Sequence, residues 1–296
     1  MATYTLSCCS TVDLSPEWLA ERNIACIFFN YELGGAWHKD DFGASIAPHD
    51  LYQRMLAGEP ATTSQVSTGD YLEFFDKELK AGRDIVHVCL SSGISGTYTS
   101  ACLAADQLRA QYPERTIRIV DSLAASAGYG LLVDKLAELR DQGMGADELA
   151  DWAEEHRLEV NHLFLSSDLT FFVRGGRISK AAGLIGGMLK VCPLMRVALD
   201  GSLEVMEKIR TKAKSEQRMI ERMMELAAGG TSYSGKVFIS NSDCLDDAKD
   251  VAHAVESTFT GIRDNKVHVF PIGATIGVHT GPGTVALFFW GTPERW

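Results

Sequence analysis

A turn rich in serine, threonine and glycine, residues 90–101, stands between a predicted buried strand and a predicted helix. The apolar, β-branched run 84–90 precedes it and indicates the strand, and residues 101–108 are typical of a helix. Ligands of open α/β sheets bind where strands end, and the first amides of a helix favour an anion. Ser95 and Thr97 would add hydroxyl donors to those amides. A simpler role is also open, in which a serine of this turn only caps the helix.

Two further loops carry groups that can donate to an anion. Thr63-Ser64-Gln65 lies in a hydroxyl-rich loop, and His279 begins the glycine-rich segment 279–283. Structural roles stay open for both, because a loop histidine often only completes a hydrogen-bond network. Four basic residues also stand out from an acidic background, and some arginines beside glycine turns only bind carbonyls. These basic residues are Arg174 with Arg177, and Lys208 with Arg210.

The composition excludes several classes of protein. The chain has 296 residues, 46% of them hydrophobic and 23% charged, as expected for a globular protein with a substantial core. A formal net charge of −11 argues against non-specific binding to nucleic acid or to an anionic membrane surface. The seven cysteines and eight histidines show no spacing typical of a disulfide framework or a metal site. We find no signal-peptide pattern and no apolar run of membrane-spanning length, so we expect a reduced, cytoplasmic protein.

Strand and helix patterns alternate through the first half of the chain. Apolar runs at 4–8, 24–29, 84–90 and 116–120 are separated by helical patterns. This alternation predicts an α/β fold with a doubly wound, mostly parallel sheet that helices cover on both faces. Within this half, Gly34-Gly35 predicts a small hairpin, and Ser67 with Asp70 has the spacing of a capping box at a helix start. The acidic helical stretch 147–158 suits a domain junction.

The second half contains a different set of elements. Asp200-Gly201 indicates a hairpin, and an apolar, glycine-bearing helix is expected over residues 182–189. Strands are predicted at 162–166, 236–240, 267–270 and 285–290. We therefore expect an N-terminal α/β domain over residues 1–160 and a C-terminal domain, a mixed sheet with helices, over residues 161–296.

Taken together, the loop motifs resemble those of the DegV family of bacterial fatty-acid-binding proteins. The resemblance runs nearly from end to end and rests on several separated motifs in the right order. These motifs are Ser10-Thr11-Val12-Asp13-Leu14, Thr63-Ser64-Gln65, Ser91-Ser92-Gly93-Ile94-Ser95-Gly96-Thr97-Tyr98, Asp121-Ser122, Asp168-Leu169, Arg174-Gly175-Gly176-Arg177-Ile178-Ser179 and Gly277-Val278-His279-Thr280-Gly281-Pro282-Gly283.

The resemblance implies a binding protein and not an enzyme. Two α/β domains would hold one long-chain fatty acid between them, with its carboxylate at the interdomain cleft and its tail in an apolar tunnel. The protein would present this acid to a fatty-acid kinase, which makes an acyl phosphate for lipid synthesis. No cofactor and no metal are implied. About fifteen tail carbons at ~0.8 kcal/mol each give roughly 12 kcal/mol gross, against an association cost of ~4–15 kcal/mol.

The resemblance also assigns roles to individual residues. Those expected at the carboxylate are Thr63, Ser64, Ser92, Ser95, Gly96, His279 and Thr280. Arg174 and Arg210 are expected to face the kinase or the transferred phosphoryl group. The residues expected to line the tail tunnel are Ile185, Leu189, Ile276 and Phe288.

Two positions depart from the family pattern. Cys9 stands where the family usually has aspartate, so an acceptor near the cleft is lost. Val66 stands where proline usually follows Thr63-Ser64-Gln65, which predicts a less rigid loop with its side-chain donors intact.

Three other functions fit the sequence less well than fatty-acid binding. A serine hydrolase would use Ser95 and His279, but the nucleophile-elbow motif fails because Thr97 stands in place of its second glycine. A nucleotide-binding enzyme ranks last, since the chain has neither a Walker-type motif nor a dinucleotide fingerprint. A scaffold protein would need no tunnel.

Overall fold

The computed structural model describes residues 4–179 and 191–293. The strands are β1 (Tyr4–Cys9), β2 (Ala25–Ile27), β3 (Asn30–Leu33), β4 (Ala36–Lys39), β5 (Ala61–Ser64), β6 (Asp84–Cys89), β7 (Ile117–Asp121), β8 (Val160–Ser166), β9 (Leu194–Val197), β10 (Leu203–Glu207), β11 (Phe238–Asn241), β12 (His268–Pro271) and β13 (Thr284–Trp290). The helices are α1 (Pro16–Glu21), α2 (Pro48–Leu56), α3 (Thr68–Lys80), α4 (Thr97–Gln111), α5 (Ser126–Asp141), α6 (Ala146–His156), α7 (Thr170–Arg174), α8 (Lys212–Leu226), α9 (Leu245–Thr258) and α10 (Ala274–Thr280), with a short 3-10 turn η1 (Ser10–Val12).

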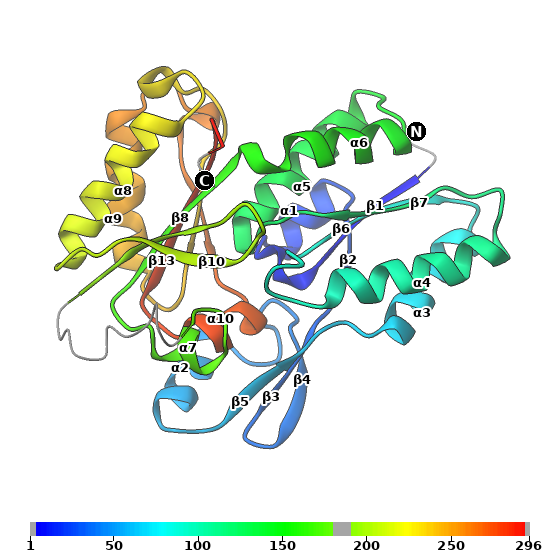
Figure 1. Cartoon of the computed structure of the whole chain (residues 1–296), viewed down its shortest axis with the longest axis horizontal. Helices are drawn as coiled ribbons and strands as arrows, with labels where there is room; N and C mark the ends of the chain where they lie inside the picture. The colour runs from blue at the N-terminus through cyan, green and yellow to red at the C-terminus, as the bar shows by residue number, and fades with distance from the viewer. Residues whose placement is uncertain (1–3, 180–190, 294–296) are drawn as a thin grey trace.

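Sheet A is the parallel sheet expected in the first half of the chain. Its strand order is β2-β1-β6-β7, and every pairing in it is parallel. Helices α3 and α4 cover one face of this sheet and α5 and α6 lie on the other (Figure 1). The prediction of a doubly wound parallel sheet is therefore confirmed.

Sheet C is the mixed sheet expected in the second half. Its order is β10-β9-β8-β13-β11-β12, with β11 and β12 parallel and the other neighbours antiparallel. The hairpin predicted at Asp200-Gly201 joins β9 to β10. Helices α8 and α9 cover the outer face of sheet C, and α5 lies on its inner face (Figure 1). The mixed α/β fold expected for this half is also confirmed.

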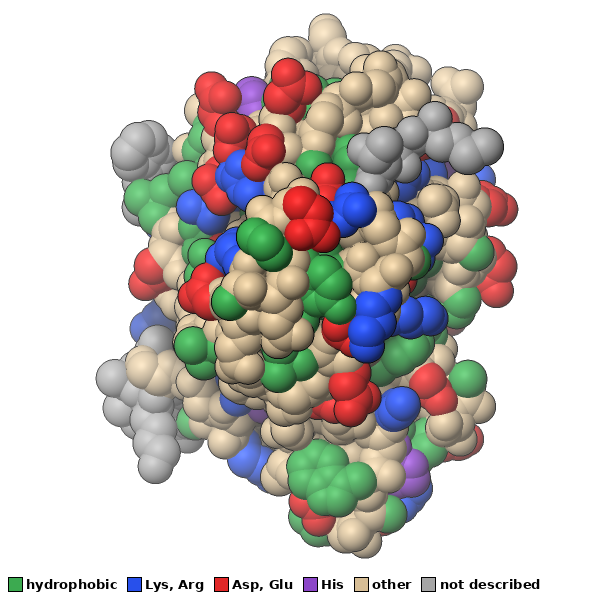
Figure 2. Space-filling model, turned by 90° about the vertical axis from the view of Figure 1, so that its right-hand side faces the viewer, with side chains coloured by type: hydrophobic (Ala, Val, Ile, Leu, Met, Phe, Trp, Pro, Cys, Tyr) green, Lys and Arg blue, Asp and Glu red, His purple; other side chains and the backbone are tan. Residues whose placement is uncertain are grey.

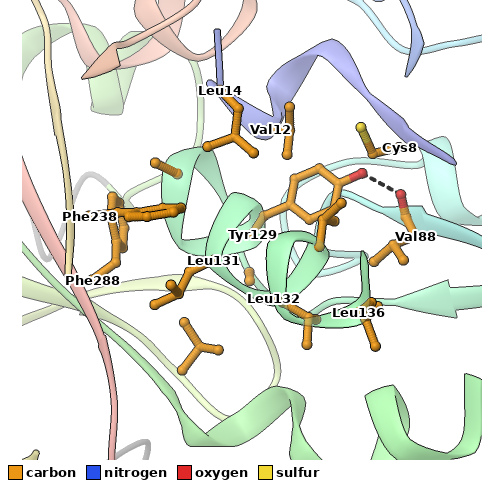
Figure 3. Close-up of a cluster of buried hydrophobic side chains, with 14 of the residues drawn as sticks. Cys8, Val12, Leu14, Val88, Tyr129, Leu131, Leu132, Leu136, Phe238 and Phe288 are labelled. Atoms are coloured by element: carbon orange, nitrogen blue, oxygen red, sulfur yellow. Dashed lines mark hydrogen bonds between the residues drawn. The ribbon is translucent and has the colours of Figure 1, made fainter. Parts of the chain in front are cut away.

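Helix α5 is buried on nearly all sides because it is packed between sheets A and C. Figure 3 shows Leu131 directed toward Phe238 and Phe288 of sheet C, while Tyr129 reaches Val88 of sheet A. One continuous core thus joins both halves of the chain. The domain boundary expected after residue 160 stays a prediction.

Sheet B is a small antiparallel sheet with the order β4-β3-β5. It lies beside α2, α7 and α10 at the bottom of the view in Figure 1. The predicted turn at Gly34-Gly35 joins β3 to β4. Thr63 and Ser64 were expected in a loop, which is wrong: they belong to β5, because their backbone pairs with Tyr31 and Asn30 of β3.

Three other local expectations need correction or lie beyond the described residues. The strand expected over 24–29 is shorter, since β2 is an edge strand that pairs only with β1. His279 and Thr280 were expected in a loop but form the end of helix α10. The helix expected over 182–189 lies outside the described residues. The capping box predicted at Ser67 and Asp70 is confirmed at the start of α3.

Acidic and basic side chains are mixed on the face of the molecule that carries α3 and α4. Figure 2 shows acidic and basic side chains interspersed there. Ion pairs account for part of this pattern, as between Lys80 and Asp76 on α3 and between Arg109 and Asp106 on α4, each at 2.5 Å. Within residues 4–179 and 191–293, no helix combines the length and the apolar content needed to cross a membrane.

The contact between α5 and sheet A generates a stability prediction. The Tyr129 hydroxyl donates to the Val88 carbonyl and accepts from the Cys9 amide at 2.9 Å (Figure 3). We expect Tyr129→Phe to lower the free energy of unfolding by about 1–3 kcal/mol, because two buried backbone groups lose their partner. Urea unfolding followed by circular dichroism measures this loss.

The control is Tyr112→Phe, which removes a hydroxyl that bonds Asp76 at the protein surface. It should cost less than Tyr129→Phe. Equal losses in the two variants would show that the hydroxyl of Tyr129 has no special role in holding α5.

Candidate functional site

A cavity of about 180 Å³ lies at the carboxyl ends of β2 and β6, where α10, β5 and β10 meet sheet A. It occupies the place where open α/β sheets bind ligands. Its lining residues come from both halves of the chain. They are Phe29, Thr63, Gln65, Leu90, Ile94, Ser95, Gly96, Ala125, Phe172, Arg177, Leu203, Thr275, Ile276, His279 and Thr280.

Thr63 and His279 form a hydrogen-bonded pair in the cavity wall. Thr63 Oγ1 on β5 lies 2.8 Å from His279 Nε2 on α10. The other ring nitrogen, Nδ1, is buried without a partner among the described residues. If Nε2 carries the proton, the imidazole donates to Thr63, and the threonine hydroxyl is free to donate to a ligand.

The turn before α4 supplies a second set of donors. Ser95 Oγ accepts a hydrogen bond from the Thr97 amide at 3.2 Å, so its own proton is available to the cavity. Helix α4 starts at Thr97, and its first amides have no acceptor within the helix. Gly96 leaves room for the Gln65 side chain here, because a Cβ at this position would lie 2.4 Å from Gln65 Oε1.

Arg177 is the cationic residue among those that line the cavity. Its guanidinium donates to the Gly175 carbonyl at 2.6 Å and to the Ile94 carbonyl at 3.1 Å. It therefore bridges the turn after α7 and the turn before α4. Burial lowers the pKa of Arg177, which means that an anion beside it would be favourable.

His279 is neutral at pH 7. Burial of the imidazole, with the nearby Arg177 charge as a second cause, lowers the pKa of His279 to about 4. The site thus combines one cation with neutral hydroxyl and imidazole donors. That set of groups can hold a carboxylate or another small anion.

Five of the residues predicted at the carboxylate line the cavity, and two do not. The five are Thr63, Ser95, Gly96, His279 and Thr280. Ser64 follows Thr63 on a strand and so points to the opposite face of sheet B, where its hydroxyl bonds the Gln65 carbonyl. Ser92 is exposed, and its amide donates to Asp121 at 3.1 Å.

The residues predicted to face a partner lie outside the cavity. Arg174 is exposed, with its guanidinium 5.2 Å from the centre of the Phe171 ring. Arg210 is exposed just beyond β10. Of the two arginines that the sequence analysis grouped together, Arg177 lines the cavity and Arg174 does not. Gly176, with a φ of 72°, turns the chain between them.

The four residues predicted to line the apolar tunnel do not lie together in the described structure. Ile276 lines the cavity. Phe288 is buried in the core between α5 and sheet C, with its ring 5.2 Å from the ring of His162. Ile185 and Leu189 lie outside the described residues. The sequence analysis did not select Phe29, Phe172 or Leu203, whose apolar side chains form part of the cavity wall.

The two departures from the family pattern are both buried. Cys9 Sγ lies 3.2 Å from the Tyr71 hydroxyl and 3.6 Å from His87 Nε2. The Tyr71 hydroxyl lies 2.8 Å from Thr97 Oγ1, so Cys9 belongs to a polar chain behind the start of α4. Val66 packs fully buried in the core between sheet A and α3.

The geometry does not assemble a serine hydrolase. His279 Nε2 is paired with Thr63, and Ser95 Oγ accepts from the Thr97 amide. A serine nucleophile needs its own hydroxyl on the base. In the described part of the chain, no group of three or more His, Cys, Asp or Glu side chains is arranged to hold a metal ion.

Comparison with known proteins gives one family. A family model described as "Uncharacterised protein, DegV family" matches residues 9–291. A DegV domain-containing protein of Clostridium perfringens is 31% identical over 286 residues, which cover 97% of each chain.

Solved structures share the fold over nearly the whole chain. A DegV family protein from Thermus thermophilus, described by its fatty acid binding, has a TM-score of 0.85 at 26% identity and covers 98% of this chain and 99% of its own. The Fatty Acid Kinase (Fak) B3 protein of Streptococcus pneumoniae, solved loaded with linoleic acid, has a TM-score of 0.83 at 21% identity and covers 97% of this chain and 99% of its own. At 21% identity, the similarity to the Streptococcus pneumoniae protein shows a shared fold only.

The environment of His279 generates a titration prediction. We expect the Cε1 proton of His279 to titrate near pH 4 in the NMR spectrum, because burial disfavours the imidazolium. His49 is exposed and paired with Asp243, which raises its pKa, so it serves as an internal control.

The same shift has a consequence for stability. Between pH 6.5 and about 4 the unfolded chain binds a proton at His279 that the native chain does not. The free energy of unfolding should therefore fall as the pH drops through this window, and His279→Asn should remove that part of the fall. Titration of His279 at or above its ordinary pKa would contradict the buried, neutral imidazole.

Proposed function

Since the chain belongs to the DegV family, we propose that it binds one long-chain fatty acid with the carboxylate in the cavity between α4 and α10. This is a binding role without a cofactor. The observation that carries it is the convergence of Thr63, Ser95, His279 and Arg177 on one cavity whose remaining lining is largely apolar. The fatty acid binding described for the Thermus thermophilus relative supports the same ligand.

The polar groups match what a carboxylate requires. An ionised carboxylate loses several kcal/mol of solvation on burial, unless donors replace water. In the proposed complex, the hydroxyls of Thr63 and Ser95 donate to the two oxygens, and His279 holds the Thr63 hydroxyl in place. Arg177 provides the opposite charge.

The apolar lining is suited to the first part of the acyl tail. Its members are Phe29, Leu90, Ile94, Phe172, Leu203 and Ile276. Each buried methylene contributes about 0.8 kcal/mol, so most of the binding energy comes from the tail and the head group decides its orientation.

We further propose that the protein presents the acid to a kinase. The name of the structurally similar Streptococcus pneumoniae protein, a fatty acid kinase B3 protein, supports this role. Arg210 and Arg174 are exposed outside the cavity, where a second protein can reach them. The ligand then lies between an N-terminal domain of residues 1–160 and a C-terminal domain of residues 161–296.

Native mass spectrometry tests the ligand directly. Protein purified without added lipid should show a mass excess that matches one long-chain fatty acid per chain. Solvent extraction followed by gas chromatography identifies it. An empty protein that also fails to bind added palmitate or oleate would overturn the proposed function.

Arg210 tests the presentation role. We expect Arg210→Ala to bind fatty acid about as tightly as the parent protein, because the side chain lies outside the cavity lining. With a cognate kinase and ATP, it should slow the formation of acyl phosphate at least several-fold. Lys249→Ala is the control, since it removes another exposed cation, from α9 on the outer face of sheet C.

Two results would count against this role of Arg210. Equal rates for Arg210→Ala and the parent protein would remove it from the transfer step. A large loss of fatty-acid affinity would instead make it an anchor for the carboxylate.

A further inference from the structure

Two buried carboxylates hold the first amides of helix α10. Asp13 Oδ1 accepts from the Gly273 amide at 3.0 Å. Asp40 Oδ1 accepts from the Ala274 amide at 3.0 Å, and its Oδ2 accepts from the Thr275 amide at 3.2 Å. We call Asp13 and Asp40 the carboxylate clamp.

The clamp reaches α10 from distant parts of the sequence. Asp13 follows η1 after β1, and Asp40 follows β4, each more than 230 positions away from the amide that it accepts. Asp13 belongs to the Ser10–Leu14 motif, which the cavity does not use. This motif therefore acts on the site through α10.

Both carboxylates are deeply buried, with 3% of Asp13 and 1% of Asp40 exposed. In the part of the chain that the structure describes, neither makes an ion pair with Lys or Arg. Hydroxyls complete their contacts: Ser126 donates to Asp13, and Ser10 donates to Asp40 at 3.3 Å. Burial raises the pKa of both groups, because it disfavours the charged form. Burying these two carboxylates therefore costs free energy, which their hydrogen bonds to the amides of α10 offset in part.

Helix α10 depends on outside partners. It has only seven residues, a length at which an isolated helix is not stable in water. Its N-cap is Gly273, which has no side chain to accept from the first turn. Glycine is needed there, because a Cβ would lie 2.8 Å from Asp13 Oδ1 and 3.2 Å from Asp40 Oδ1.

The same helix carries much of the polar wall of the cavity. Thr275, Ile276, His279 and Thr280 all come from α10. The 2.8 Å contact between His279 and Thr63 thus depends on where α10 starts and how it is rotated. The apolar wall comes mainly from other elements, such as Phe29 and Phe172.

We propose that Asp13 and Asp40 are positioning residues that give the cavity its preference for a carboxylate over an uncharged head group. They fix the amides of α10 and so hold His279 and Thr63 at the distance at which both can serve the ligand. This inference rests on the proposed binding of a fatty acid. It adds that loss of the clamp weakens recognition of the head group and leaves burial of the tail largely intact.

The test compares two ligands with the same sixteen-carbon chain, palmitic acid and 1-hexadecanol. Asp40→Asn keeps the shape of the side chain but replaces one acceptor oxygen with an amide donor that faces the N–H groups of α10. We expect its affinity for palmitic acid to fall about tenfold or more, and its affinity for hexadecanol to stay within about twofold. The His279 Cε1 resonance should shift as well.

Asp41→Asn is the matched control. It makes the same change at the next residue, whose carboxylate accepts from the Ser45 amide in an exposed turn, whereas the first amides of α10 bond Asp13 and Asp40. Its ratio of palmitic acid to hexadecanol affinity should equal that of the parent. If Asp40→Asn does not fold, Gly273→Ala provides the same test. It keeps both carboxylates, but the added methyl group pushes them away from the first amides of α10.

The outcomes separate the two hypotheses. A parent protein that binds neither ligand would overturn the proposed function itself. A parent that prefers palmitic acid, with variants that lose both affinities equally or lose only thermal stability, would reduce the clamp to a structural role. The clamp predicts that the variants lose the preference for palmitic acid over hexadecanol and that the His279 resonance shifts.

Discussion

Helix α5 sets the constraint on which the rest of the molecule depends. It is buried between sheets A and C, so both sheets must pack on the same helix. Tyr129 binds backbone groups of sheet A, and Asp134 accepts from Lys236, next to β11 of sheet C, at 2.6 Å. The two sheets therefore keep a fixed spacing, and Ala125, just before α5, lies in the wall of the cavity that they leave.

This fixed spacing matters because the site is divided among elements that are distant in sequence. Thr63 comes from sheet B, Ser95 from the turn after β6, Arg177 from the turn after α7, and His279 from α10. A buried anion gains most from donors that are already in place, since no energy is then spent on orienting them. Burial also keeps His279 neutral, so the one full positive charge in the lining is that of Arg177.

Sequence patterns predicted local features well and long-range ones poorly. The capping box of α3 and the hairpin turns at Gly34-Gly35 and Asp200-Gly201 depend on neighbouring residues, and all three were predicted. The strand at Thr63 was missed because it exists only through pairing with β3. The helix that contains His279 was missed because carboxylates far away in sequence hold its first turn. Arg177 could not be separated from Arg174 without the geometry of the turn between them.

The central claim is that the carboxyl end of a fatty acid lies beside Thr63 and His279. The most direct measurement is an isotope-edited nuclear Overhauser spectrum of the protein loaded with palmitate that is ¹³C-labelled at C2. We predict cross-peaks from the C2 methylene to the imidazole protons of His279 and to the methyl group of Thr63. Bound palmitate with cross-peaks from C2 to other residues and none to these two would contradict the account.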